Sequence, residues 1–180
     1  HINILNEIPE IHRPIFLFIM RQGVRPSEGR AIQWQDIDLK FKTVTICRSW
    51  DLKVLKEHTK NKKIGIIPLN EEVFEMLQNL SKIRQSIKKE DFVFTNKGKP
   101  YSACKLSTIW RRISKRLGYD ITLYEGTRHS LASQAVNNGV PLNIIGASLR
   151  HSDNRTTLRY AHLNTSSMNS VFNLIEKKTE

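Results

Sequence analysis

The hydrophobic positions along the chain change from helical to alternating spacing and back again. Over residues 9–22 apolar side chains recur every three or four positions, and Gly23 follows as a stop signal, which predicts a helix. Over residues 37–47 apolar and polar residues alternate, which predicts a small antiparallel hairpin. A third short strand is expected over residues 64–69, closed by Pro68.

The remainder of the chain has helical spacing. Asn70 is expected to cap a helix, and further helices are expected over residues 106–117, 127–138 and 141–149. Pro26 suits the first turn of a short helix, which places Arg25 at a helix mouth. The predicted fold class is therefore α+β and mainly α-helical, with a small three-stranded antiparallel sheet.

The charge of the chain indicates its partner. Among 180 residues there are 29 Lys plus Arg against 17 Asp plus Glu, a formal net charge of +12. Such an excess favours a polyanionic partner, above all nucleic acid, although a cationic soluble protein shows the same balance. No membrane partner is predicted, because no run is long enough to cross a bilayer and no lipidation signal is present. Cys47 and Cys104 fit neither a disulfide framework nor a metal site, so a reducing compartment, the cytoplasm, is expected.

Three sequence motifs near the end of the chain carry side chains suited to phosphodiester chemistry. Arg128 lies in E-G-T-R-H-S, His151 in L-R-H-S-D and Tyr160 in T-T-L-R-Y-A-H-L, and Arg25 lies far upstream in G-V-R-P-S-E. A phenol can attack phosphorus, guanidiniums bind phosphate oxygens in pairs, and an imidazole can donate a hydrogen bond or move a proton. Any one of these residues alone would be read as structural, but the ordered set favours catalysis without a metal.

These motifs resemble those of the tyrosine recombinases, the family of phage and mobile-element integrases, over nearly the whole chain. The resemblance implies a helical catalytic domain that cleaves and rejoins DNA through a 3′-phosphotyrosyl intermediate, with no metal, other cofactor or ATP. It implies that Tyr160 is the nucleophile, that Arg25 and Arg128 hold the phosphate, and that His151 assists them.

The family also has a lysine on the turn between its second and third strands, which protonates the departing 5′ oxygen. The candidates here lie in T-K-N-K-K and are Lys60, Lys62 and Lys63. Lys60 matches the family pattern best and is the predicted general acid.

The chain departs from the family at two positions. Glu125 stands where members usually carry histidine three residues before the second arginine, and Arg150 replaces the usual glycine before His151. Glu125 is retained as a candidate catalytic residue because a carboxylate can accept a proton. Either the two charges compensate each other, or Glu125 faces solvent and Arg150 contacts DNA independently.

The helix expected over residues 106–117 carries a row of cations on its polar face. No acidic residue lies between them, which favours contact with DNA phosphates over a purely solvated face. The predicted DNA-binding residues are Arg111, Arg112, Lys115, Arg116 and Arg150.

Residues 1–180 are interpreted as a single catalytic domain. The chain starts at His1 rather than Met, which suggests a fragment, and the family's N-terminal core-binding domain is absent from it. The resemblance implies a homotetramer on double-stranded DNA for the full-length protein and a monomer for the isolated domain.

Three other functions compete with this one. The first is a basic DNA-binding module with a degenerate, inactive site, supported by Glu125 and Arg150. The second is a strand-nicking enzyme like the type IB topoisomerases, whose local motifs fit less well. A metal-dependent nuclease is the third, and the acidic residues Asp36, Asp38 and Asp51 do not have metal-ligand spacing.

Overall fold

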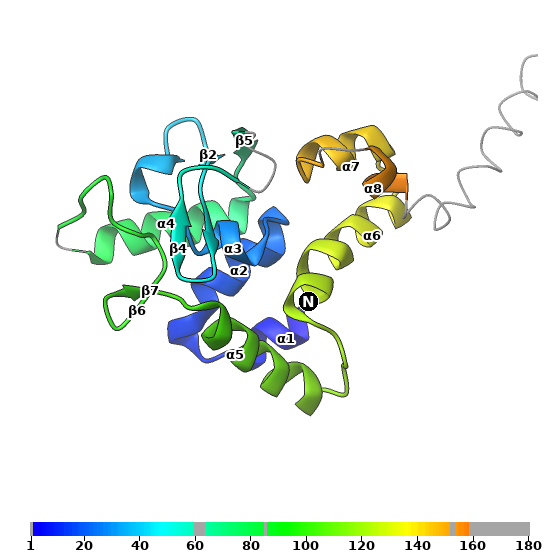
Figure 1. The fold of residues 1–180 in the computed structure, drawn as a ribbon, viewed down its shortest axis with the longest axis horizontal. Helices are drawn as coiled ribbons and strands as arrows, with labels where there is room; N and C mark the ends of the chain where they lie inside the picture. Colours follow the sequence, from blue (N-terminus) through cyan, green and yellow to red (C-terminus); the bar gives the residue numbers. More distant parts are fainter. Residues whose placement is uncertain (1, 60–63, 85, 152–153, 159–180) are drawn as a thin grey trace, which may run out of the picture. The chain divides into compact units, whose positions relative to one another are not determined.

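A computed structural model of the chain describes residues 2–59, 64–84, 86–151 and 154–158. The chain forms two compact units, His1–His129 and Ser130–Glu180. Figure 1 shows the helices and strands of both units along the sequence. No helix in the described ranges combines the length and the apolar character that a membrane crossing requires.

The first unit is built mainly of helices. Its α-helices are α1 (Ile2–Glu7), α2 (Arg13–Gln22), α3 (Pro26–Gly29), α4 (Glu71–Ile83) and α5 (Ala103–Arg116). Two 3-10 turns, η1 (Glu10–His12) and η2 (Trp34–Asp36), and a π-helical segment, η3 (Glu125–His129), complete the helical set. The prediction of a helix over residues 9–22 was four residues too long, because a separate 3-10 turn precedes α2 and Pro14 occupies the first turn of α2.

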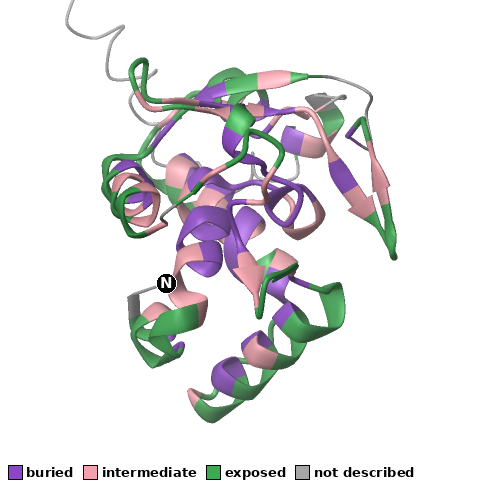
Figure 2. Cartoon of the chain, turned by 90° about the vertical axis from the view of Figure 1, so that its left-hand side faces the viewer, coloured by how far each residue is buried: buried purple, intermediate pink, exposed green. Residues whose placement is uncertain are grey.

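Helix α2 is buried along most of its length. Figure 2 shows in purple how the buried residues gather on the inner helices and strands. Phe16 of α2 stacks on Trp110 of α5, with ring centroids 6.4 Å apart, and Phe18 contacts Phe94. Trp34 is part of the same hydrophobic core. Gly23 ends α2 in the left-handed conformation, with φ of 59°, as a C-terminal glycine commonly does.

The predicted three-stranded antiparallel sheet is confirmed. Its strands are β1 (Ile37–Asp38), β2 (Thr43–Ile46) and β5 (Gly65–Pro68), in the order β1-β2-β5. Val44 pairs with Ile67 across the β2–β5 ladder, and both side chains are buried. The alternating pattern that predicted the hairpin therefore marks the face of β2 that packs on the core.

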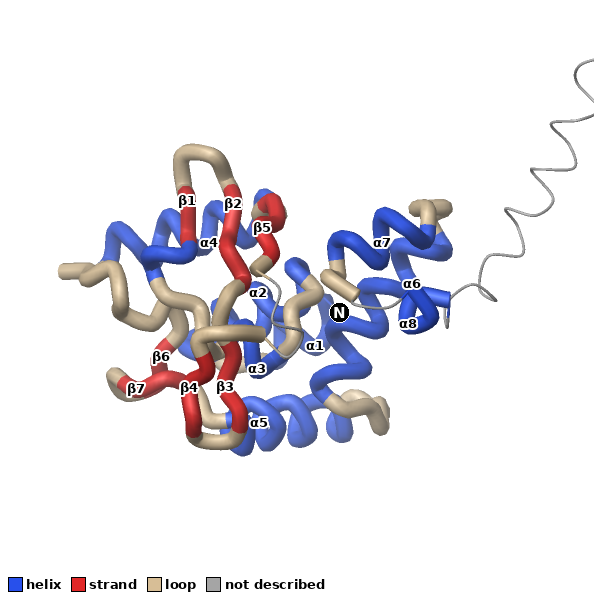
Figure 3. Tube along the Cα trace, turned by 45° about the horizontal axis from the view of Figure 1, so that its top comes forward, coloured by secondary structure: helices blue, strands red, loops and turns tan. Residues whose placement is uncertain are grey.

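Two further hairpins were not predicted. One joins β3 (Ser49–Asp51) to β4 (Val54–Lys56), and the other joins β6 (Thr95–Asn96) to β7 (Lys99–Pro100). Figure 3 shows β3 and β4 apart from the three-stranded sheet. Trp50, Leu52 and Val54 alternate with polar residues near the first turn, but Leu52 and Val54 are exposed, so this alternation does not mark a face buried in the core.

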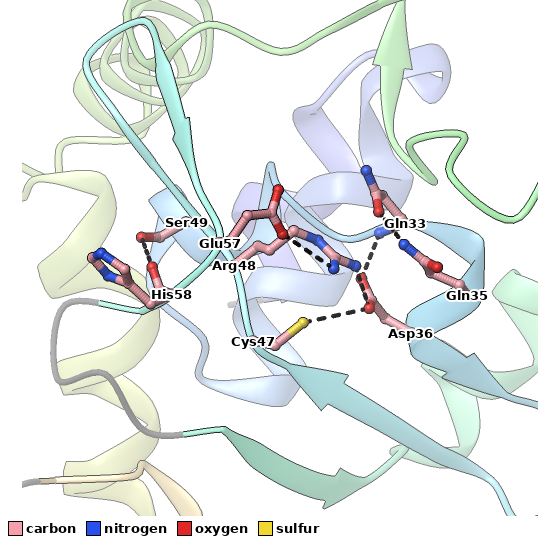
Figure 4. Close-up of polar contacts among 8 residues, drawn as sticks. All are labelled: Gln33, Gln35, Asp36, Cys47, Arg48, Ser49, Glu57 and His58. Atoms are coloured by element: carbon pink, nitrogen blue, oxygen red, sulfur yellow. Dashed lines mark hydrogen bonds and ion pairs between the residues drawn. The ribbon is translucent and has the colours of Figure 1, made fainter.

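A buried ion pair anchors the chain just before β3. Arg48 pairs with the carboxylate of Asp36 and, at 3.7 Å, with Glu57, the residue that follows β4 (Figure 4). Cys47 donates a weak hydrogen bond to the same carboxylate at 3.6 Å. Burial, followed by the negative charge of Asp36, raises the pKa of the Cys47 thiol. The network therefore fixes the base of the hairpin to η2.

The second unit contains α6 (Ser130–Asn137), α7 (Leu142–Ser148) and α8 (Asn154–Leu158). The four buried apolar residues of its small core are Ala132, Val136, Ile145 and Leu149. The helices predicted over residues 127–138 and 141–149 correspond to α6 with its preceding π-helical segment and to α7. The spacing of Met168, Val171, Phe172 and Ile175 predicts an amphipathic tail over residues 166–177, which lies outside the described residues.

Candidate active site

Arg25 is held at the mouth of α3 by a carboxylate three residues later. Its backbone is extended, with φ of −64° and ψ of 142°, because Pro26 disfavours helical angles in the residue before it. Glu28 accepts hydrogen bonds at 2.9 Å from both the backbone amide and the guanidinium of Arg25. The Glu28 side chain is fully buried, whereas the Arg25 side chain is partly exposed. Glu28 thus fixes Arg25 and leaves part of its guanidinium open to solvent.

Arg128 reaches the same turn from a distant part of the sequence. It lies in the π-helical segment η3, its side chain is 1% exposed, and one guanidinium nitrogen donates to the carbonyl of Gly23 at 2.7 Å. Gly23 is two residues before Arg25. The structure therefore brings the two predicted catalytic arginines to one turn between α2 and α3.

A close helix contact fixes the segment that carries Arg128. A Cβ atom added at Gly126 would lie 2.1 Å from Cζ2 of Trp110, so only glycine fits against that ring. The Trp110 indole nitrogen also donates to the Ile121 carbonyl at 2.9 Å. Short π-helical segments occur frequently at functional sites, and Trp110 holds the chain that leads into Arg128 at both Ile121 and Gly126.

Glu125 is engaged at the start of the helix that leads into Arg128. Its carboxylate accepts from the Thr122 amide at 2.9 Å and from the Thr122 hydroxyl at 2.7 Å, and that hydroxyl accepts from the Glu125 amide at 3.2 Å. This reciprocal arrangement is a capping box. The hydrogen bonds from the Thr122 amide and then its hydroxyl lower the pKa of the Glu125 carboxylate. The motif T-L-Y-E carries this signal in the sequence, and the sequence interpretation missed it.

His151 follows the end of α7 and is held by two hydrogen bonds. Its amide donates to the Gly146 carbonyl at 2.9 Å, and its Nδ1 lies 2.8 Å from the Thr157 hydroxyl. Thr157 is buried and packs against Gly146, where an added Cβ atom would lie 2.8 Å from the hydroxyl oxygen. Gly146, Thr157 and His151 form one close-packed group, and the sequence motifs alone did not single out Thr157.

Arg150 occupies a backbone position suited to glycine. Its φ is +54°, its amide donates to Ala147, and the next amide, from His151, donates to Gly146. Together these hydrogen bonds form a Schellman motif, which places a left-handed residue immediately after the helix cap. This geometry explains in physical terms why glycine suits the position before His151.

Two of the predicted catalytic residues cannot be placed. Lys60, together with its alternatives Lys62 and Lys63, and Tyr160 lie outside the described residues. The chain is described again from Ile64, just before β5, and Thr59, the residue before Lys60, is buried.

The cations predicted to bind DNA lie on the exposed face of α5. Arg111, Arg112, Lys115 and Arg116 are all exposed, while Leu106, Trp110 and Ile113 of the same helix are buried. Arg116 forms an ion pair with Glu7 of α1. Within the described ranges the other three form no ion pair, so their charges remain available to an anionic partner.

Acidic side chains in the described part of the chain do not form a metal cluster. No group of three or more His, Cys, Asp or Glu side chains there could hold a metal ion. Asp36 and Asp51, which were considered as metal ligands, are paired with Arg48 and Lys56 instead.

A model of the phage integrase family matches residues 2–167. The chain belongs to the phage integrase family. The predicted family is thus confirmed. Tyrosine recombinase XerD of Staphylococcus saprophyticus is 30% identical over 170 residues, which are 89% of this chain and 53% of that protein. Tyrosine recombinase XerC of Pediococcus pentosaceus is 29% identical over 152 residues, 78% of this chain and 46% of that protein.

Solved structures of integrases share the fold. The Tn1549 transposon integrase in complex with circular intermediate DNA matches with a TM-score of 0.79 at 20% identity, over 96% of this chain and 64% of that one. The catalytic domain of bacteriophage HP1 integrase matches with a TM-score of 0.67 at 20% identity, over 99% and 92%. The predicted fold class is confirmed, and this integrase-family chain spans about half or less of the length of the first curated relatives that it matches.

Proposed function

We propose that this chain is the catalytic domain of a tyrosine site-specific recombinase, which cleaves and rejoins double-stranded DNA without metal or ATP. The observation that carries the proposal is the delivery of Arg128 to the turn that holds Arg25. Two guanidiniums at one turn can bind the non-bridging oxygens of a phosphodiester and stabilise the charge of the transition state.

In the proposed reaction, the Tyr160 oxygen attacks the phosphorus and the bond to the 5′ oxygen breaks. The phenol loses a proton, and the departing 5′ oxygen gains one, which we assign to Lys60. His151 donates a hydrogen bond to the phosphate or handles the tyrosine proton. The 3′-phosphotyrosyl ester keeps the energy of the broken bond, so a 5′ hydroxyl can reverse the reaction and reseal the strand.

We assign different roles to the remaining predicted residues. Glu28 is a positioning residue for Arg25, and Glu125 acts through the helix cap that precedes Arg128. Arg111, Arg112 and Lys115 bind phosphates in any sequence, and Arg116 contributes less because Glu7 neutralises it. Arg150 is proposed as a further DNA contact.

The full-length protein is proposed to act in the cytoplasm as a tetramer on its recombination sites, with a core-binding domain that closes around the DNA. The role in recombination is supported by the names of similar proteins, such as the integrase of Shigella phage Sf6, which is 26% identical over 73% of this chain and 31% of that protein.

Trapping of a covalent adduct on nicked DNA tests the proposal. The full-length protein would be incubated with suicide duplexes tiled over the DNA that flanks the gene. In these nicked duplexes, cleavage releases a short fragment that carries the 5′ hydroxyl, and its loss prevents resealing. We expect an adduct that survives denaturing electrophoresis for the natural protein and no adduct for Tyr160→Phe, with DNA affinity nearly unchanged. An adduct of normal yield with Tyr160→Phe would refute the assignment. DNA binding without any adduct would favour the inactive module, and loss of activity in EDTA would favour a metal-dependent nuclease.

A further inference from the structure

Arg30 is a buried cation immediately after the helix that Arg25 begins. It caps the C-terminal end of α3, and its side chain is 3% exposed. The indole nitrogen of Trp50, in β3, donates to the Arg30 carbonyl at 3.2 Å, and the Trp50 ring centroid lies 5.9 Å from the guanidinium carbon. The unpredicted β3–β4 hairpin therefore places an aromatic ring beside a buried positive charge.

No acceptor for this charge is found among the described residues. The Nε atom of Arg30 is buried without a hydrogen-bond partner, and no described carboxylate forms an ion pair with the guanidinium. Burial lowers the pKa of Arg30, and no described acidic group offsets the effect. A buried charge is usually paired, because removing it from water is unfavourable, so this guanidinium is well suited to binding an anion.

Arg84 shows how the same chain satisfies a comparable arginine. Its guanidinium lies 5.6 Å from the ring of Trp34, much as Arg30 lies beside Trp50. Its two terminal nitrogens, however, donate to the carbonyls of Phe92 and Val93 at 3.0 and 2.8 Å. Arg84 is thus satisfied within the fold, and the ring contact alone does not account for the unmet hydrogen bonds of Arg30.

Arg30 lines a cavity of about 290 Å³ in the first unit. Hydroxyl groups and aromatic rings share the lining, from Ser27, Ser107, Trp50 and Tyr124. Ser27 is two residues after Arg25, so the cavity lies beside the turn that carries the proposed scissile-phosphate arginine. A guanidinium with neighbouring hydroxyl donors is a chemistry that matches phosphate oxygens.

We propose that this cavity binds a DNA backbone phosphate through Arg30, next to the phosphate that Arg25 and Arg128 hold for cleavage. The proposal rests on the proposed function in so far as the anion is taken to be DNA. The net charge of +12 and the position beside Arg25 favour DNA over a free anion. A second phosphate held in a cavity would fix the register of the strand relative to Tyr160.

The salt dependence of DNA binding tests the proposal. The full-length Tyr160→Phe protein, which cannot cleave, would be compared with and without Arg30→Met, which keeps an unbranched apolar stem and removes the charged guanidinium. We expect the slope of log affinity against log salt to fall by about one unit. Arg84→Met is the matched control, and it should leave the slope unchanged. An unchanged slope for Arg30→Met, or equal changes in both variants, would overturn the proposal.

Uncharged analogues of the backbone phosphate can locate the contact between Arg30 and DNA. Single methylphosphonate groups would be scanned along the duplex, and one position should weaken the natural protein about as much as Arg30→Met does, with no further loss when the two changes are combined. Additive losses at every position would contradict a direct contact between Arg30 and a phosphate.

Arg30 can also be observed directly in the protein that retains it, so the result does not depend on whether the Arg30→Met variant folds correctly. In ¹⁵N-arginine-labelled protein, the Arg30 Nε resonance should shift when duplex DNA is added and stay in place with inorganic phosphate at the same phosphate concentration. A shift with inorganic phosphate and none with DNA would identify a free anion and reject the DNA assignment. Failure of the adduct assay alongside a positive result here would reject the proposed cleavage while leaving the phosphate site intact.

Discussion

Arg128 and His151, two residues assigned to the same reaction, are held in place by different kinds of contact. The Arg128 guanidinium bonds to Gly23, 105 residues away in the sequence, within the large core of the first unit. His151 bonds to Thr157, six residues away, at the end of a short helix in the second unit. The position of Arg128 therefore depends on tertiary folding of the first unit, whereas the hydrogen bonds of His151 need only two adjacent helices.

The arginine region should show the largest effects. We expect Arg25→Ala and Arg128→Ala each to lower the single-turnover cleavage rate about 10²–10³-fold, as the loss of one transition-state donor does. Lysine at either position should restore the rate only in part, because the paired donors are lost. The rate of adduct formation on suicide duplexes, at saturating DNA, measures single-turnover cleavage. A near-normal rate for either alanine variant would make that arginine a surface cation.

The same variants should differ in stability, which sharpens the contrast between the regions. Arg128→Ala removes a buried link between η3 and the end of α2 and should lower the free energy of unfolding, whereas His151→Ala should leave the first unit as stable as before. Urea titrations followed by tryptophan fluorescence report on this unit, since Trp34, Trp50 and Trp110 all lie in it.

A moderate effect is expected from Thr157, which orients the His151 ring. Thr157→Val keeps the shape and removes the hydroxyl, and we expect cleavage to fall about tenfold, the equivalent of one hydrogen bond of about 1.4 kcal/mol. Thr157→Ser should recover most of the rate, and Gly146→Ala should mimic Thr157→Val by displacing the hydroxyl. In a His151→Ala background Thr157→Val should have no further effect; a further tenfold loss there would show that Thr157 acts by some other route.

A smaller effect concerns the backbone at Arg150. Arg150→Gly should make the chain more stable than Arg150→Ala by about 1–2 kcal/mol, because only glycine adopts positive φ without a steric cost. Both variants lack the arginine side chain, so the difference between their free energies of unfolding reports the steric cost of positive φ and not the loss of a side-chain contact. Equal free energies of unfolding in urea would contradict the left-handed geometry.

The smallest effect is expected at the exposed Glu125 cap. Its folded pKa lies below the unfolded value, so the ionised carboxylate stabilises the chain above the unfolded pKa, and this stability is lost as pH falls through the folded pKa. Glu125→Gln should therefore lower the urea midpoint of unfolding at neutral pH. Below the folded pKa of Glu125, the variant and the natural chain should have the same urea midpoint. A difference that persists after the carboxylate is protonated would rule out the cap as its origin.

The sequence predicted the elements and residues that are encoded locally. Gly23 and Asn70 mark helix ends by their chemistry, and the alternation around Val44 marks the strand that pairs on both sides. The order of Arg25, Arg128, His151 and Tyr160 was enough to predict the family. The cap of Thr122 and Glu125 is also encoded locally, in the motif T-L-Y-E, but the sequence interpretation assigned Glu125 to catalysis.

Other features depend on contacts that no local pattern records. Arg30 belongs to no motif, and its burial depends on Trp50, which the chain brings back from 20 residues away. The β3–β4 hairpin that carries Trp50 exposes Leu52 and Val54 near its turn, so the alternation of apolar residues there does not mark a half-buried strand. Thr157 becomes a partner of His151 only because Gly146 leaves room for its hydroxyl.

Identification of the residue that carries the DNA tests the account most directly. The covalent complex of the natural full-length protein with a suicide duplex would be digested with trypsin and nuclease, and the modified peptide sequenced by tandem mass spectrometry. We predict a nucleotide ester on the oxygen of Tyr160, attached through a 3′ phosphate. A nucleotide on any other side chain, or a 5′ phosphate linkage to Tyr160, would contradict the proposed reaction.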